Sequence, residues 1–189
     1  SRPLAPGVWL LGGGSHNSAL VEFRTFVALV EAPQNDERSQ AVVAEVRRLV
    51  PNKPIRYIVN THYHWDHSGG LRGLVAAGAN QLVTHDGNVE YYNRVMFGPP
   101  RRLMPDSLSQ REELLGTIIR PQYVRMGNQP GMIHDREWGT PTAGKIMEFY
   151  SVGTGSPPYS SHNEFFLAVY LPAERILINA DLYTPPAAG

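Results

Sequence analysis

The chain has 189 residues, with 17 basic and 17 acidic side chains and no cysteine. This length fits a single domain over residues 1–189. The balanced charge provides no sequence-wide field that would attract nucleic acid, so a polyanionic partner is not expected. The absence of cysteine excludes disulfides, thiolate metal sites and cysteine nucleophiles, and any metal must be held by histidine and carboxylate.

Apolar residues are nowhere continuous enough to predict a membrane span of about 20 residues. Residues 1–14 also lack the basic start and long apolar run of a signal peptide. We therefore expect a soluble protein with a small-molecule substrate and no membrane partner. The compartment is left open between the cytoplasm and, after removal of a leader, the periplasm.

The first half of the chain alternates predicted strands with predicted helices. Strands are predicted over residues 8–11, 19–30, 55–59 and 81–84. Helices are predicted after Asn35 or Asp36 as far as Pro51, over residues 70–77, and after Asp86. The strand over residues 55–59 is expected to be buried, so the residues that follow it emerge at its carboxyl end.

The second half is predicted to be mainly strands, over residues 117–126, 132–138, 145–152, 165–171 and 176–179. Between the two halves, residues 98–109 contain several prolines and are expected to form a surface flap. The segment 103–115 is our candidate for substrate specificity.

Four potential metal ligands fall within six positions directly after the buried strand. They are His62, His64, Asp66 and His67. The odds of this pattern by chance are on the order of a few in ten thousand, so coincidence is a poor explanation. Crowded imidazoles and a carboxylate are costly to bury unless a cation pairs with them. The ligand types predict one or two Zn ions, with Fe or Mn as alternatives.

This His-x-His-x-Asp-His pattern, followed by small residues and glycines, resembles the signature of the metallo-β-lactamase superfamily. The resemblance continues through Ser161-His162-Asn163, the strand 165–171 and Ala180-Asp181. It implies an α+β fold, the αββα sandwich, with a metal cleft at one edge between the two sheets.

The end of the chain departs from this pattern. The family's usual last strand and helix, and its last histidine ligand, have no counterpart before Gly189. We therefore expect a domain shortened at its C-terminus, with a weakened second metal site. An uncovered second sheet would favour association into a homo-oligomer.

The resemblance also implies roles for individual residues. The first metal would be bound by His62, His64 and His162. The second would be bound by Asp66 and His67, with Asp181 bridging the two. Asp66 would in addition orient a metal-activated water and help to move its proton.

The implied reaction is hydrolysis of an ester, lactone, thioester or amide-type bond, with water rather than a side chain as the nucleophile. An aspartate at position 181 is typical of glyoxalase-II-like thioesterases and lactonases. An iron-dependent enzyme similar to persulfide dioxygenases is an alternative. A degenerate, non-catalytic module is another, although the intact Asp66 and Asp181 argue against it.

Four further residues are candidates for the substrate pocket: His85, His16, Tyr63 and Trp65. For each of them a structural role is the favoured interpretation. His85 is expected to cap a helix or to bond locally, and His16 to lie in a surface turn. The two aromatic residues are expected to pack under the motif loop.

Overall fold

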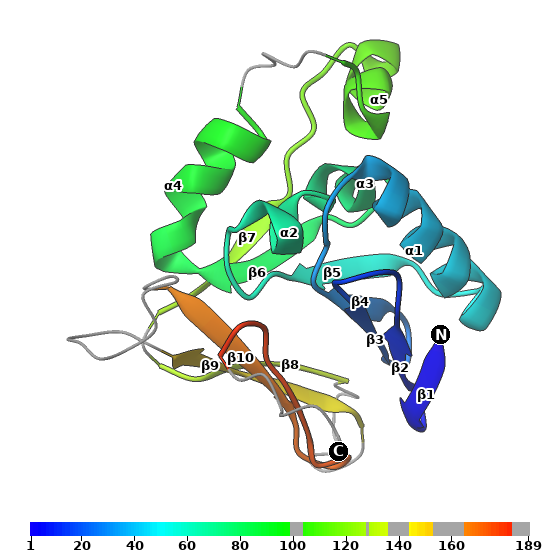
Figure 1. The fold of residues 1–189 in the computed structure, drawn as a ribbon, viewed down its shortest axis with the longest axis vertical. Coiled ribbons are helices and arrows are strands. Elements are labelled where there is room, and N and C mark those ends of the chain that lie inside the picture. The colour runs from blue at the N-terminus through cyan, green and yellow to red at the C-terminus, as the bar shows by residue number, and fades with distance from the viewer. Residues whose placement is uncertain (99–103, 128, 136–143, 153–164, 183–189) are drawn as a thin grey trace.

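The computed structural model describes residues 1–98, 104–127, 129–135, 144–152 and 165–182. Within these ranges the strands form two sheets (Figure 1). The first sheet has the order β1-β2-β3-β4-β5-β6-β7. Its strands are β1 (Arg2–Ala5), β2 (Val8–Leu11), β3 (Ser18–Glu22), β4 (Val27–Val30), β5 (Ile55–Val59), β6 (Gln81–His85) and β7 (Gln122–Met126).

Strand direction changes in the middle of this sheet. Strands β1 to β4 pair antiparallel, whereas β4 to β7 pair parallel. The second sheet is antiparallel throughout and has the order β11-β10-β9-β8. Its strands are β8 (Gly131–His134), β9 (Ile146–Val152), β10 (Phe166–Leu171) and β11 (Ile176–Ile178).

The helices are α1 (Asp36–Leu49), α2 (Trp65–Ser68), α3 (Leu71–Ala76), η1 (Asp86–Asn88), α4 (Val89–Tyr91), η2 (Tyr92–Met96) and α5 (Ser107–Leu115). Helix α1 begins where predicted, because the Asn35 side chain accepts a hydrogen bond from Arg38 N at 2.8 Å. Among the described residues, none of the helices combines the length and apolar character that crossing a membrane requires.

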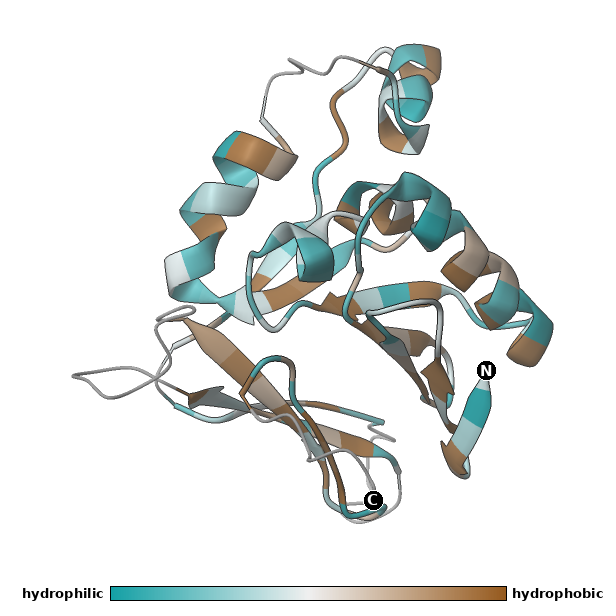
Figure 2. Cartoon of the chain, in the orientation of Figure 1, coloured by the Kyte–Doolittle hydropathy of each residue, from teal (hydrophilic) through white to brown (hydrophobic). Residues whose placement is uncertain are grey.

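Two apolar cores explain the layering. One lies between the helices and the first sheet, where Val42, Val46 and Leu74 meet Leu29 and Ile58. The other lies between the sheets. Its residues come from both sheets and include Val21, Ala28, Val59, Phe149, Leu167 and Val169. Apolar residues follow the facing strands of the two sheets, whereas the helices carry polar residues along their outer sides (Figure 2).

The helix layer and the two packed sheets confirm the predicted α+β sandwich. In the described ranges every helix precedes residue 116, so the outer helix layer that the resemblance implies has no element there. Burial by both a helix layer and a second sheet explains why β4 and β5 are rich in Val, Ile and Leu.

Several predicted boundaries were wrong. The strand predicted over residues 19–30 is two strands, β3 and β4, joined by a tight turn in which Phe23 N donates to Phe26 O at 2.9 Å. The strand predicted from residue 117 begins only after Pro121, which has no N–H for strand pairing. The flap was predicted as far as residue 109, but helix α5 begins at Ser107 because the Asp106 side chain caps it. Residues 99–103 and 136–138 lie outside the described residues, and β1 was not predicted.

Candidate metal centre

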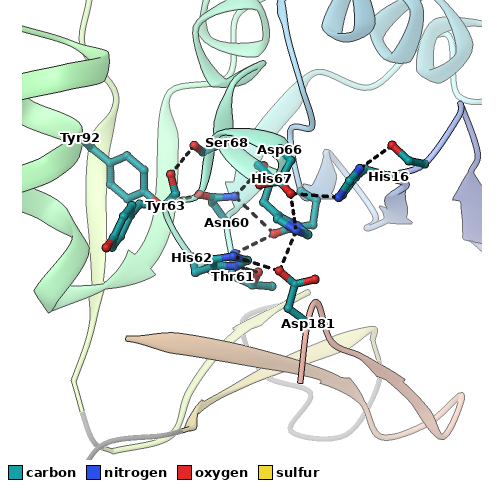
Figure 3. A network of polar contacts seen from close by, with 12 residues as sticks. His16, Asn60, Thr61, His62, Tyr63, Asp66, His67, Ser68, Tyr92 and Asp181 are labelled. Carbon is teal, nitrogen blue, oxygen red and sulfur yellow. Dashed lines mark hydrogen bonds and ion pairs between the residues drawn. The ribbon is translucent and has the colours of Figure 1, made fainter. Parts of the chain in front are cut away.

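The candidate site lies at the carboxyl ends of the parallel strands β4, β5 and β6. Glu31 directly follows β4, Asn60 directly follows β5, and the two segments are tied together because Glu31 N donates to Val59 O at 2.8 Å. Side chains that leave parallel strands at this edge converge, and ligands bind there in open α/β sheets. The histidine motif therefore emerges toward the second sheet (Figure 3).

His62 is the most deeply buried residue of the motif, with none of its surface exposed. Its Nδ1 hydrogen-bonds with Thr61 Oγ1 at 3.1 Å, and its ring packs against Phe166 with the centroids 4.3 Å apart. These contacts direct Nε2 toward Asp181, whose Oδ2 lies 3.4 Å away. The His64 ring lies beside the His62 ring, with the centroids 4.7 Å apart.

The short helix α2 turns Asp66 and His67 toward the same place. Its end is packed tightly against the segment after β4, because Ala32 N donates to His67 O at 3.0 Å. A Cβ atom on Gly69 would lie 2.0 Å from the carbonyl oxygen of Gln34. The glycine after the motif is therefore a steric requirement of this approach.

His67 is oriented by a buried carboxylate. Its Nδ1 donates to Glu31 Oε2 at 2.6 Å, and both side chains are at least nine-tenths buried. Burial alone would lower the pKa of His67, but the hydrogen bond and charge of Glu31, with the charges of Asp181 and Asp66, raise it above its ordinary value. The second ring nitrogen, Nε2, consequently faces the site.

Glu31 belongs to a buried polar network that sequence analysis did not identify. Its other oxygen, Oε1, accepts hydrogen bonds from Thr61 N at 2.8 Å and from Asn60 Nδ2 at 3.3 Å. Asn60 Oδ1 accepts from the hydroxyl of Tyr92, and burial raises the pKa of that hydroxyl well above its usual range. Glu31 itself has a φ of 69°, an uncommon conformation for a residue with a side chain.

Asp181 reaches the site from the other sheet, in the bend that follows β11 and three residues after Ile178. Its Oδ2 lies 3.1 Å from His67 Nε2 and 3.4 Å from His62 Nε2, between the two imidazoles (Figure 3). Its φ of 60° is also in the left-handed region. Glu31 and Asp181, two of the three carboxylates around His67, therefore both have a strained backbone, as residues at functional sites often do.

Asp66 meets a histidine from a different part of the chain. His16, in the loop between β2 and β3, places Nε2 3.2 Å from Asp66 Oδ2. Its ring meets the His67 ring edge-on, with the centroids 5.0 Å apart. The interpretation of His16 as a surface turn residue was therefore wrong, because folding of the first sheet brings that turn against α2.

The described side chains form three overlapping groups whose ligand atoms lie within 4.8 Å of one another. They are His62, His64 and Asp181; His16, Asp66 and His67; and Glu31, His62 and His67. The oxygens of Glu31 are already engaged by Nδ1 of His67 and by Thr61 and Asn60, so Glu31 is placed to orient His67 rather than to bind an ion itself.

A cation fits this donor set. His67 Nε2 is buried and makes no hydrogen bond of acceptable geometry within the described ranges, although it lies near two carboxylates. A buried nitrogen left in this way is costly unless it coordinates an ion. Imidazole and carboxylate are ligands that suit Zn and similar divalent metals. His162, predicted as a ligand, lies outside the described residues.

The remaining pocket candidates differ in their placement. His85 is 5% exposed and its Nδ1 accepts a hydrogen bond from Gly87 N, which confirms the predicted local helix cap. Tyr63 packs on Tyr91 with the ring centroids 4.7 Å apart, also as predicted. Trp65 is 66% exposed, so the prediction that it packs under the loop was wrong.

Comparison with known proteins identifies the family of this chain. The family profile described as the metallo-beta-lactamase superfamily matches residues 11–182. A curated relative, the alkyl/aryl-sulfatase BDS1 of Saccharomyces cerevisiae, is 32% identical over 59 residues, which are 31% of this chain and 9% of that protein. The chain thus spans less than a tenth of the length of this relative.

Solved structures share the fold at low sequence identity. A metallo-beta-lactamase from Pontibacter korlensis superposes with a TM-score of 0.61 and 16% identity, covering 96% of this chain and 68% of that one. The sec-alkylsulfatase Pisa1 from Pseudomonas sp. gives a TM-score of 0.57 and 20% identity, over 90% of this chain and 29% of that one. From the profile match and the shared fold we conclude that the chain belongs to the metallo-beta-lactamase superfamily.

Proposed function

We propose that the protein is a metal-dependent hydrolase that uses water to cleave an ester, lactone, thioester or amide-type bond. One observation carries this proposal. The ligand atoms of His62, His64, His67 and Asp181 converge although they come from two different sheets. Family membership supports the reaction class, because the superfamily resemblance implies a water nucleophile.

Two adjoining metal positions account for the arrangement. His62, His64 and Asp181 would hold one ion, with His162 as a further predicted ligand. Asp66 and His67 would hold the second, with Asp181 between the two. Zinc, iron and manganese all suit these ligands, and zinc is the first choice for a four-coordinate site with imidazole nitrogens.

A bound divalent ion would lower the pKa of a coordinated water toward neutrality and polarise the bond that is cleaved. The protein's own part is positional. Asp66 has 30% of its side chain exposed, so its carboxylate is within reach of solvent water. We propose that it orients that water and accepts its proton, which would be a general-base role. The charges of Asp181 and Glu31 flank His67 and hold its ring in place.

The test is hydrolysis of chromogenic esters, lactones and thioesters by the zinc-loaded chain. We expect activity that is lost on chelation and that falls by about 10²–10⁴-fold in Asp66→Asn. The matched control, Asp135→Asn, alters a carboxylate that caps a turn by accepting from Arg24 N, away from the site. Equal turnover by the chelated protein or by Asp66→Asn would contradict the proposal.

A sulfate ester is a second candidate substrate. The specific observation is the 32% identity over 59 residues to a protein described as an alkyl/aryl-sulfatase. Aryl and alkyl sulfates therefore belong in the substrate panel. Release of inorganic sulfate that depends on metal and on Asp66 would favour this class over carboxylic esters, whereas release from carboxylic esters alone would exclude it.

A further inference from the structure

A side chain of helix α1 holds the loop between β2 and β3 in place, at residues that precede His16 in the chain. A Cβ atom on Gly13 would lie 1.8 Å from Nη1 of Arg38, so the guanidinium packs directly on this glycine. Arg38 Nη2 also donates to Leu11 O at 2.9 Å, at the end of β2. The loop is thereby fastened to helix α1, and this restricts the positions that His16 can occupy.

Hydrogen bonds that begin at Nδ1 orient the imidazole of His16. Its Nδ1 bonds with Ser15 Oγ at 2.7 Å, and Ser15 Oγ accepts in turn from Gln34 Nε2 at 3.2 Å. A histidine that donates from Nδ1 to a neighbour presents an Nε2 lone pair, the usual arrangement of a metal-bound imidazole. In His16 this Nε2 is the atom that faces Asp66 (Figure 3).

A second observation points to the same place. His67 is 6% exposed and its Nε2 has no hydrogen bond of acceptable geometry within the described residues, yet it is directed at this group, 3.9 Å from Asp66 Oδ2. A simple ion pair between His16 and Asp66 would leave this nitrogen, which lies 3.1 Å from Asp181 Oδ2, still without a hydrogen bond of acceptable geometry among the described residues. A cation contacted by all three side chains would satisfy it.

We propose that His16 is a protein ligand of the second metal position, together with Asp66 and His67. The loop after β2 would thus add a second imidazole beside that of His67 to the carboxylate of Asp66, a combination of ligand types that suits zinc. The inference rests on the proposed function, because it assumes that the cluster binds metal. It assigns the loop after β2 to the metal site.

Zinc titration of the full chain against a chromogenic chelator tests the proposal. We expect two equivalents for the wild type, and one of them about 100-fold weaker or absent in His16→Ala. The matched control is His134→Ala, which removes an imidazole on β8 that belongs to none of the described clusters. It should retain both equivalents, and circular dichroism should show that all the proteins are folded.

Two further measurements identify direct ligation. Cadmium-113 bound to protein labelled with ¹⁵N-histidine should show scalar coupling to the Nε2 of His16. The His16→Lys variant keeps a cation opposite Asp66 without an imidazole, so it should bind the second equivalent as poorly as His16→Ala does. Wild-type affinity in His16→Lys would mean that His16 serves only as an ion-pair partner, and would overturn the inference.

The outcomes separate this inference from the proposed function. If the wild type binds no metal, both are overturned. If His16→Ala binds the same number of equivalents as the wild type with unchanged affinity, and cadmium shows no coupling to His16, only the inference is overturned. In that case metal-dependent hydrolysis can still be tested through Asp66.

Discussion

Replacing Glu31 with glutamine tests whether the buried network sets the proton position on His67. Glutamine has the same shape but offers one acceptor oxygen and one NH₂ group. Two donors, Thr61 N and Asn60 Nδ2, face the position that Oε1 of Glu31 occupies. The amide oxygen of the glutamine must therefore take this position. The NH₂ group then faces His67 Nδ1, where Glu31 accepts a hydrogen bond at 2.6 Å.

Two donors cannot share one hydrogen bond, so His67 would have to present its Nδ1 lone pair and carry its proton on Nε2. That is the nitrogen that faces Asp181 at 3.1 Å, and it could then bind metal only after losing the proton or turning the ring. Loss of such an orienting partner typically lowers metal affinity 10–100-fold, or about 1.4–2.7 kcal/mol. We expect Glu31→Gln to weaken zinc binding within this range.

The measurement is zinc competition with a chelator at neutral pH, alongside ¹⁵N chemical shifts of the His67 ring, which distinguish the two tautomers. Glu22→Gln is a matched control. Glu22 lies at the end of β3, binds Lys53 Nζ at 2.6 Å and belongs to none of the described clusters of possible metal ligands. Unchanged zinc affinity in Glu31→Gln, or a proton still on Nδ1 of His67, would refute the reasoning.

Two further predictions concern stability. Although burial opposes it, hydrogen bonds from the Arg72 guanidinium help to hold the pKa of Asp106 at about 2, below the usual 3.8. With the hydrogen bonds from Ser109, the ionised Asp106 carboxylate should therefore contribute about 2 kcal/mol above pH 4, and this contribution is lost as the pH falls through about 2. Urea unfolding of Asp106→Asn should lack that pH dependence, and a parallel loss in the variant would contradict this. Gly69→Ala should lower the melting temperature by roughly 3–10 °C, because its Cβ would lie 2.0 Å from Gln34 O. The matched control is Gly12→Ala, whose Cβ would meet only an ordinary contact at 3.5 Å. Equal melting temperatures for the two glycine variants would show that the segment adjusts freely.

Local patterns were sufficient for the elements whose signals lie within a few residues. The start of α1 follows from the Asn35 side chain, and the strand character of β5 follows from its apolar, β-branched sequence. The boundaries that failed depended on the tertiary context. Residues 19–30 are apolar apart from Glu22, Arg24 and Thr25 and contain no glycine or proline, so the turn became evident only from the pairing of β3 with β4.

The chemistry of the motif follows from local sequence, because His62, His64, Asp66 and His67 occupy a short segment that any fold keeps together. A polar residue directly after the buried run of residues 27–30 was a usable signal for Glu31, and it was not recognised.

The distant side chains that join the motif are selected by how the sheets and helices pack. Glu31 lies 36 positions before His67, and Asp181 arrives from a separate sheet. His16 lies in the loop between β2 and β3, and nothing in its neighbouring residues indicates a site. Such contacts depend on strand order and sheet packing, which arise from burial of apolar residues throughout the chain and not from the residues beside each ligand.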